Sequence, residues 1–221
     1  MNPTRSGTAL GRPAPPEAAT PAGRERAGGV EGNARLTGIV AAALFVVLGA
    51  EGVTLLGIRQ LISVHVFVGM LLVPLVVLKT ASTCYRTARY YSGDARYRQK
   101  GPPHPILRVT GPFLVLTSLA LLGSGIALVA LGRRVGHGYL WVHKTVFFVW
   151  GALIAVHVLG HLRETVTLAS ADWRARPPVA GVRGRVALLG AALAVGVALA
   201  VVSLGWVGSW GDVAEFGHHF G

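Results

Sequence analysis

Three histidines lie within one long apolar stretch of the chain, Gly138–Leu162: His143, His157 and His161. An imidazole is costly to place in hydrocarbon, so a histidine in such a segment usually ligates a cofactor, relays protons or hydrogen-bonds a neighbouring helix. On a helix, His143 and His157 fall within about 40° of one face and about 21 Å apart along the axis. Two histidines on one face favour cofactor ligation over a single helix–helix hydrogen bond.

A second apolar stretch, Leu61–Ser82, carries a related pattern. His65 is followed about four helical turns later by Lys79, the same spacing that separates His143 from His157. The second stretch thus holds one histidine and one lysine where the later stretch holds two histidines.

Each histidine-bearing stretch is preceded by a similar glycine-containing segment. These segments are LGAEGVTLL at residues 48–56 and LGSGIALVA at residues 122–130. The similarity indicates a weak internal repeat of two parallel helical hairpins. His65 and His143 lie about one turn inside the outer ends of their stretches, so we expect them at matching depth on facing helices.

The composition indicates a membrane protein. Of the 221 residues, 52% are hydrophobic and 14% are charged, and the mean hydropathy is +0.55. Soluble domains carry about 25% charged residues. Five apolar segments approach the roughly 20 residues that a helix needs to cross a bilayer: Leu36–Leu56, Leu61–Ser82, Ile106–Leu131, Tyr139–Leu162 and Val186–Val207. We therefore expect an all-α integral membrane protein with a four-helix transmembrane bundle and a fifth transmembrane helix.

The chain divides into five predicted regions. Residues 1–34 are rich in Pro, Gly, Ala and Arg, which predicts a disordered cytoplasmic tail. The other regions are the bundle at residues 35–165, a basic cytoplasmic loop at 166–184, the fifth helix at 185–208 and a short exterior tail at 209–221. The single cysteine of the chain excludes an intramolecular disulfide.

The charge distribution predicts the orientation. The formal net charge is +12, which in a soluble protein would favour nucleic-acid binding. Here the basic residues lie between apolar segments, so we expect the basic loop Tyr85–Lys100 to contact anionic lipid headgroups and not nucleic acid. The tail and the longer connections at 83–105 and 163–185 hold most of the arginines. The positive-inside rule then places the N-terminus in the cytoplasm and the C-terminus outside the plasma membrane.

Haem chemistry fits the paired histidines. Haem iron takes two axial ligands on opposite faces of the porphyrin, and bis-histidine ligation suits an electron carrier because no open position remains. We expect His65 and His143 to hold one haem in the bundle core. Gly123 and Gly125 would leave room for the flat cofactor, and Lys144 would neutralise a propionate. Close helix packing and snorkelling to headgroups are the structural alternatives for these three residues.

Two segments resemble a known family. HVFVG at residues 65–69 and HKTVFFVWGALIAVH at residues 143–157 resemble the histidine-bearing helices of the bacterial cytochrome b561 family and of related four-helix haem-binding modules of reductases and dehydrogenases. The resemblance covers residues 36–162. It implies haem b bound between four helices and electron transfer between quinol and a redox partner protein.

Carried over residue by residue, the resemblance implies His65 and His143 as the axial ligands of one haem b, and His157 as one ligand of a second haem near the other face. The first span departs from the family pattern, because it contains no histidine and Glu51 is its only charged residue. The position related to His157 by the repeat is Lys79, a poor ligand while protonated. We therefore predict one haem, with two as the open alternative.

The predicted function is one-electron transfer by a membrane-bound b-type cytochrome, between the quinone pool and a redox partner protein. Such a protein is an electron-transfer component rather than a stand-alone enzyme. One alternative is a haem-free structural or regulatory helix bundle, in which His65 and His143 hydrogen-bond across helices. Another is a transporter that uses the histidines as a metal or proton relay.

Overall fold

The computed structural model describes residues 21–99, 101, 105–132, 136–174 and 181–207, and every regular element in them is a helix. The long helices are α1 (Pro21–Thr54), α2 (Ile58–Tyr91), α4 (Pro105–Leu131), α5 (Gly136–Arg174) and α6 (Val182–Val207). A one-turn 3-10 helix, η1 (Leu55–Gly57), joins α1 to α2, and the short α3 (Ala95–Gln99) follows α2. The expected all-helical fold is confirmed for this part of the chain.

Four stretches of the described chain are long and apolar enough to cross a membrane: Gly29–Tyr91, Arg108–Leu131, Gly138–Ala171 and Val182–Val207. The first contains 63 residues and includes both α1 and α2. At about 1.5 Å per residue, a straight helix of that length would be roughly three times as long as the hydrocarbon core is thick. The chain instead turns at η1, and α2 runs back beside α1.

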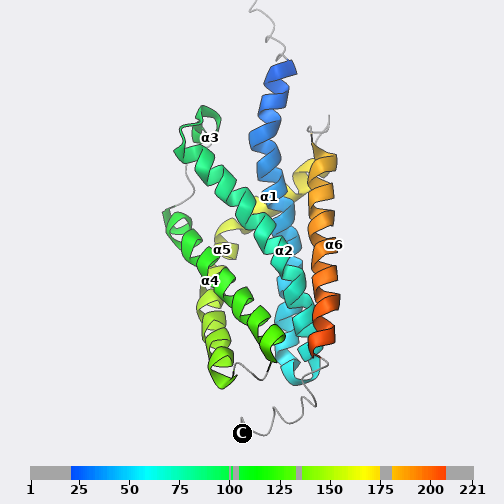
Figure 1. Ribbon diagram of the computed structural model, residues 1–221. Coiled ribbons are helices and arrows are strands. Elements are labelled where there is room, and N and C mark those ends of the chain that lie inside the picture. The colour runs from blue at the N-terminus through cyan, green and yellow to red at the C-terminus, as the bar shows by residue number, and fades with distance from the viewer. Residues whose placement is uncertain (1–20, 100, 102–104, 133–135, 175–180, 208–221) are drawn as a thin grey trace, which may run out of the picture.

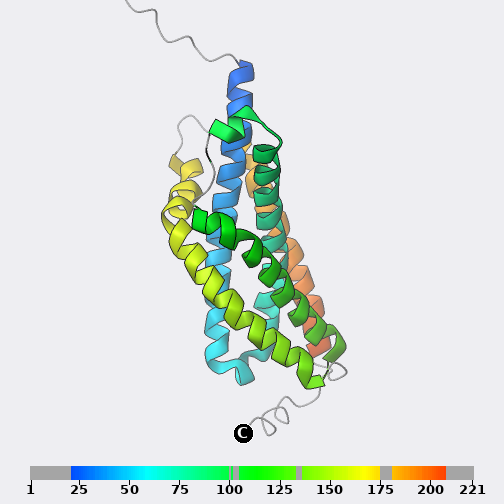
Figure 2. The ribbon, with the colours of Figure 1, turned by 90° about the vertical axis from the view of Figure 1, so that its left-hand side faces the viewer.

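Four of the long helices form a ring (Figures 1 and 2). Around it, α1 contacts α2, α2 contacts α4, α4 contacts α5, and α5 contacts α1. Helices α2 and α5 are therefore diagonal to each other. Helix α6 lies outside the ring, where it packs along α2 and touches α1 and α4 less extensively.

Glycine permits close contact between helices at two places. A Cβ atom at Gly38 of α1 would lie 2.5 Å from Cβ of Leu168 on α5. A Cβ atom at Gly196 of α6 would lie 2.8 Å from Cδ1 and 3.0 Å from the carbonyl oxygen of Leu71 on α2. In a membrane, where hydrophobicity does not drive helices together, small residues of this kind allow the close packing that holds helices in place.

Many large apolar side chains point away from the bundle. Trp141, Phe148 and Leu159 of α5 are 73%, 73% and 77% exposed. A surface of this kind would aggregate in water and is suited to contact with lipid. The buried apolar cluster is small by comparison and consists of Val66, Met70, Val129, Ala200 and Val207.

The tail predicted for residues 1–34 ends earlier than expected, because α1 begins at Pro21. Proline suits the first turn of a helix, where its missing N–H needs no partner. Within the extension, the carboxylate of Glu31 pairs with the buried guanidinium of Arg35 one turn later. Residues 1–20 lie outside the described residues.

The basic loop predicted for residues 166–184 is likewise helical over its first part, because α5 continues to Arg174. The proposed fifth helix, residues 185–208, corresponds to α6, which begins three residues earlier, at Val182. The exterior tail predicted for residues 209–221 lies outside the described residues.

Helix α2 continues past the predicted end of its span at Ser82 and carries polar and aromatic residues there. The rings of Tyr85 and Tyr97 meet edge to face, with centroids 6.2 Å apart, and Arg89 donates to Asp94 at 2.7 Å. Burial, together with the neighbouring Tyr85, raises the pKa of the Tyr97 phenol. These contacts attach α3 to the end of α2.

Replacing Gly196 with valine should destabilise the packing of α6 on α2. The new Cβ atom would meet the backbone of Leu71, and overpacking of this kind costs about 1–3 kcal/mol. We expect a lower midpoint of thermal unfolding for the detergent-solubilised variant. Gly190→Val is the matched control, because Gly190 lies on the same helix and a Cβ atom added there would have nothing within 4 Å. Equal midpoints for both variants would contradict the assigned contact.

Candidate functional site

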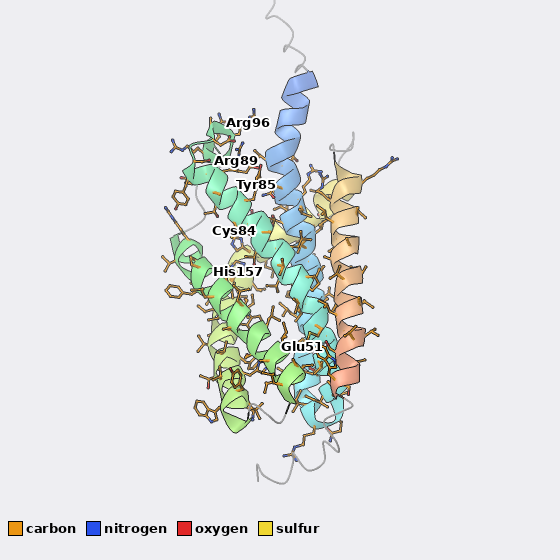
Figure 3. All side chains as sticks on the ribbon, viewed as in Figure 1. Glu51, Cys84, Tyr85, Arg89, Arg96 and His157 are labelled. Carbon is orange, nitrogen blue, oxygen red and sulfur yellow. The ribbon has the colours of Figure 1, made fainter. Side chains whose placement is uncertain are left out.

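The polar groups beside His65 come from the end of α1. Nδ1 of His65 lies 3.0 Å from Oε1 of Glu51 and 3.0 Å from Oγ1 of Thr54. The Glu51 and His65 side chains are 16% and 21% exposed, and Thr54 is buried. The turn at η1 brings the three together, because it folds the start of α2 back beside the end of α1, where Figure 3 shows Glu51.

The hydroxyl hydrogen of Thr54 determines which nitrogen of His65 carries the proton. Thr54 Oγ1 donates to the carbonyl oxygen of Glu51 at 2.6 Å, and a hydroxyl has one hydrogen to give. Toward His65, the Thr54 oxygen and the Glu51 carboxylate are therefore both acceptors, and Nδ1 of His65 is the donor. A neutral His65 then presents the lone pair of its other nitrogen, Nε2.

His143 has the same arrangement with a different partner. Ser124 Oγ donates to the carbonyl oxygen of Leu121 at 2.9 Å and lies 2.9 Å from Nδ1 of His143. By the same count of hydrogens, Nδ1 of His143 donates and Nε2 presents a lone pair. Gly125 leaves space for this ring, since a Cβ atom there would lie 3.2 Å from Cε1 of His143.

His65 and His143 are brought together across the ring of helices. They lie on the diagonal helices α2 and α5, and their imidazoles are close enough to interact electrostatically. The hydrogen bonds of these rings with Glu51, Thr54 and Ser124 are made by Nδ1. The two histidines that the sequence paired therefore lie near each other, and these bonds do not engage Nε2 of either ring.

Side chains do not fully cover the inner face of α5. This helix contacts both α4 and α1, yet none of its described side chains is buried. A helix with neighbours on two sides normally buries an apolar stripe, because protein interiors are close-packed. Helix α5 thus contributes no buried apolar stripe to the bundle, and the side chains of His143 and His157 are only partly covered.

His157 lies farther along α5, nearer the middle of the bundle (Figure 3). Its ring stands 4.8 Å from that of His161, and His161 pairs with Glu164 through a contact of 3.0 Å. Nδ1 of His157 is buried without a hydrogen-bond partner among the described residues. The described helices around α5 place no second imidazole opposite His157.

Lys79 is close enough to His157 to interact with it electrostatically, but its ammonium has another role. Lys79 Nζ donates to the carbonyl oxygen of Thr37 on α1 at 3.0 Å. Beside it, the hydroxyls of Thr37 and Ser82 lie 3.0 Å apart, and Asn33 Nδ2 donates to the carbonyl oxygen of Ser82 at 3.2 Å. The network fastens α1 to α2, so the structure gives Lys79 a packing function.

The remaining predicted site residues, Gly123, Gly125 and Lys144, differ in whether they contact the proposed ligands. Gly125 touches the ring of His143, whereas Gly123 is exposed, and a Cβ atom added there would have nothing within 4 Å. Lys144 is exposed next to His143 and makes an interaction of its own, so its role at a propionate stays a prediction.

Within the described residues, no group of three or more His, Cys, Asp or Glu side chains could hold a metal ion. Bis-histidine ligation of haem iron needs two protein ligands, and His65 and His143 fit that requirement.

Three site residues were not predicted from the sequence: Glu51, Thr54 and Ser124. The signal for them is their polarity inside otherwise apolar segments, 48–56 and 122–130, which also form the predicted repeat. A buried polar side chain needs a partner in the membrane, and the histidines of the following helices were the available partners.

No protein-family model matches this chain, and comparisons with curated proteins and with solved structures gave no match. The resemblance to the cytochrome b561 family therefore stays a prediction, and the function is argued from the geometry of the site.

We expect both His65 and His143 to carry a proton on Nδ1. The hydroxyls of Thr54 and Ser124 have already given their hydrogens to backbone carbonyls and can only accept. Nitrogen-15 NMR of histidine-labelled protein, assigned with His65→Asn and His143→Asn variants, distinguishes the two ring tautomers. Signals from the Nε2–H tautomer at either position would contradict this arrangement.

Proposed function

We propose that the protein is a membrane-bound b-type cytochrome, in which His65 and His143 are the axial ligands of one haem b. The observation that supports this most strongly is the proximity of two imidazoles on diagonal helices, each hydrogen-bonded through Nδ1 to a polar side chain. Histidine ligands of metals normally donate their second ring nitrogen to such an outer partner, which fixes the tautomer and the ring orientation.

When bound, the haem would supply reversible exchange of one electron between ferrous and ferric iron. The protein's own residues hold the two imidazoles: Glu51 and Thr54 orient His65, and Ser124 orients His143. The absence of a Cβ atom at Gly125 lets the His143 ring approach α4. The apolar helices keep water from the site, and the bilayer gives access to a membrane-soluble electron carrier such as a quinone. A redox partner protein would accept or supply the electron.

The proposed topology has five spans, α1, α2, α4, α5 and α6, with the N-terminus in the cytoplasm. Support comes from the fold of the stretch Gly29–Tyr91, which is long enough for two crossings and turns at η1. Arginines gather at the opposite end of the bundle from η1, on the end of α2, on α3 and at the starts of α4 and α6. By the positive-inside rule this end faces the cytoplasm of a plasma membrane. The site of His65 and His143 then lies in the outer half of the bilayer.

The contacts in the inner half of the bundle argue against a second haem and favour a total of one haem per chain. Lys79, the residue opposite His157, is engaged by the backbone of α1. A single haem in the outer half would exchange electrons with the quinone pool or an exterior partner and would not by itself carry them across the membrane.

Purified protein, expressed with ample haem, should show a reduced b-type absorption spectrum with about one haem per chain. His65→Ala and His143→Ala should each lose the haem, because either change removes an axial ligand. His157→Ala should retain it and serves as the matched control on the same helix as His143.

Full haem content in both ligand variants would refute the assignment of the ligands. Two haems per chain, one of them lost in His157→Ala, would establish a second site in the inner half. A wild-type protein without haem would refute the cytochrome and favour a structural bundle in which the same hydrogen bonds only join helices.

The single cysteine tests the topology. Cys84 is exposed on α2, two residues past the predicted end of the span at Ser82. A membrane-impermeant maleimide should label it in inside-out vesicles and not in sealed right-side-out cells. Leu56→Cys in a Cys84→Ser background is the control, because Leu56 is 88% exposed at the opposite end of the bundle. That variant should be labelled only from outside, and the reverse pattern would invert the proposed orientation.

A further inference from the structure

The two proposed ligands have unequal surroundings. His143 has neutral hydrogen-bond partners, the hydroxyl of Ser124 and the backbone carbonyl of Leu121. His65 donates to a carboxylate, that of Glu51, as well as to the hydroxyl of Thr54. The carboxylate of Glu51 is therefore the charged group that distinguishes the surroundings of the two imidazoles.

Glu51 is placed where its charge acts strongly on His65. Its side chain is 16% exposed, and its second oxygen, Oε2, is buried without a hydrogen-bond partner in the described chain. A charge in surroundings of low polarity is weakly screened, and its effect on a neighbour 3.0 Å away is correspondingly large. An acidic residue with an unsatisfied oxygen inside a membrane is costly and is commonly functional.

The neighbouring helix is shaped to admit this carboxylate. Gly69 lies one turn after His65 on α2, and a Cβ atom there would stand 3.4 Å from Oε1 of Glu51. A larger side chain would crowd the carboxylate. Gly69 thus keeps the space in which Glu51 reaches Nδ1 of His65.

We infer that Glu51 is a positioning residue that makes His65 the more electron-donating of two unequal haem ligands and so stabilises the ferric over the ferrous state. The inference rests on the proposed function. Its chemistry is that of outer hydrogen bonds in general: a carboxylate that accepts from Nδ1–H draws the proton toward itself and raises the basicity of Nε2. A more basic ligand favours the more highly charged iron, and the Glu51 charge itself acts in the same direction.

The test is the midpoint potential of the purified holoprotein, measured by redox titration of its absorption spectrum. Glu51→Gln keeps the size of the side chain and a carbonyl acceptor but removes the charge. We expect it to increase the ratio of ferrous to ferric haem at a fixed applied potential by tenfold or more, which is a rise of about 59 mV for a one-electron couple. Ser124→Ala at the other ligand is the matched control and should change the ratio less.

A second variant tests the opposite direction. Thr54→Val removes the hydroxyl that shares the His65 proton, so the hydrogen bond passes wholly to Glu51. We expect the midpoint potential to fall, and the electron paramagnetic resonance spectrum of the ferric protein to shift in the direction opposite to that of Glu51→Gln. This variant keeps the inference testable if Glu51→Gln does not fold.

The outcomes separate the two proposals. Haem binding with potentials unchanged in both Glu51→Gln and Thr54→Val would overturn the inference and leave the cytochrome intact. A shift in Ser124→Ala as large as that in Glu51→Gln would also overturn it, because the two ligands would then be equivalent. Failure of the wild-type protein to bind haem would refute the proposed function itself.

Discussion

A polar group in the hydrocarbon core must find its hydrogen-bond partner within the protein, and the polar side chains inside this bundle are arranged by that requirement. Glu51 and Thr54 meet His65, and Ser124 meets His143. In each case the partner comes from the preceding antiparallel helix of a hairpin. The hydrogen bonds therefore fix how the two helices of each hairpin are rotated relative to each other.

The buried apolar cluster is small, which makes these polar contacts more important. The close approaches are made through Gly38 against Leu168 and Gly196 against Leu71, and many large apolar side chains face outward. Helix α6 adds a support on the outside of α2, through a stripe of small residues that includes Ala200 and Ser203. The helices are thus held together by small residues at their close approaches and by polar contacts between neighbours.

The fold class followed from apolar segments of membrane length, which are long and strongly marked in this chain. The proximity of His65 to His143 was also predictable, because depth in a membrane helix depends mainly on the distance from its end, and both residues lie about one turn from theirs. The contact of Glu51 with His65 was harder to predict. Its contact with His65 depends on the geometry of the turn at Leu55–Gly57, where a shift of one residue would rotate Glu51 by about 100° around the helix. Apolar periodicity does not determine a turn to that accuracy.

The helical extensions at Pro21 and Arg174 were missed because they continue beyond the apolar segments that defined the spans.

The repeat suggests how the two halves of the bundle came to differ in chemistry. His65 and Lys79 on α2 occupy the positions that His143 and His157 occupy on α5. The structure places His65 near His143 and Lys79 near His157. At the position nearer η1, both residues are imidazoles whose Nδ1 is hydrogen-bonded. At the other position one residue is Lys79, which holds a backbone carbonyl of α1, and the histidine near it has a buried nitrogen with no partner among the described residues. An ammonium has no lone pair to present to a metal, and Nζ of Lys79 is directed at the carbonyl oxygen of Thr37. For this position to ligate iron, Lys79 would have to lose a proton and turn away from Thr37, at the expense of the network that joins α1 to α2. The position nearer η1 requires no such rearrangement, which supports the proposal that the cofactor binds there.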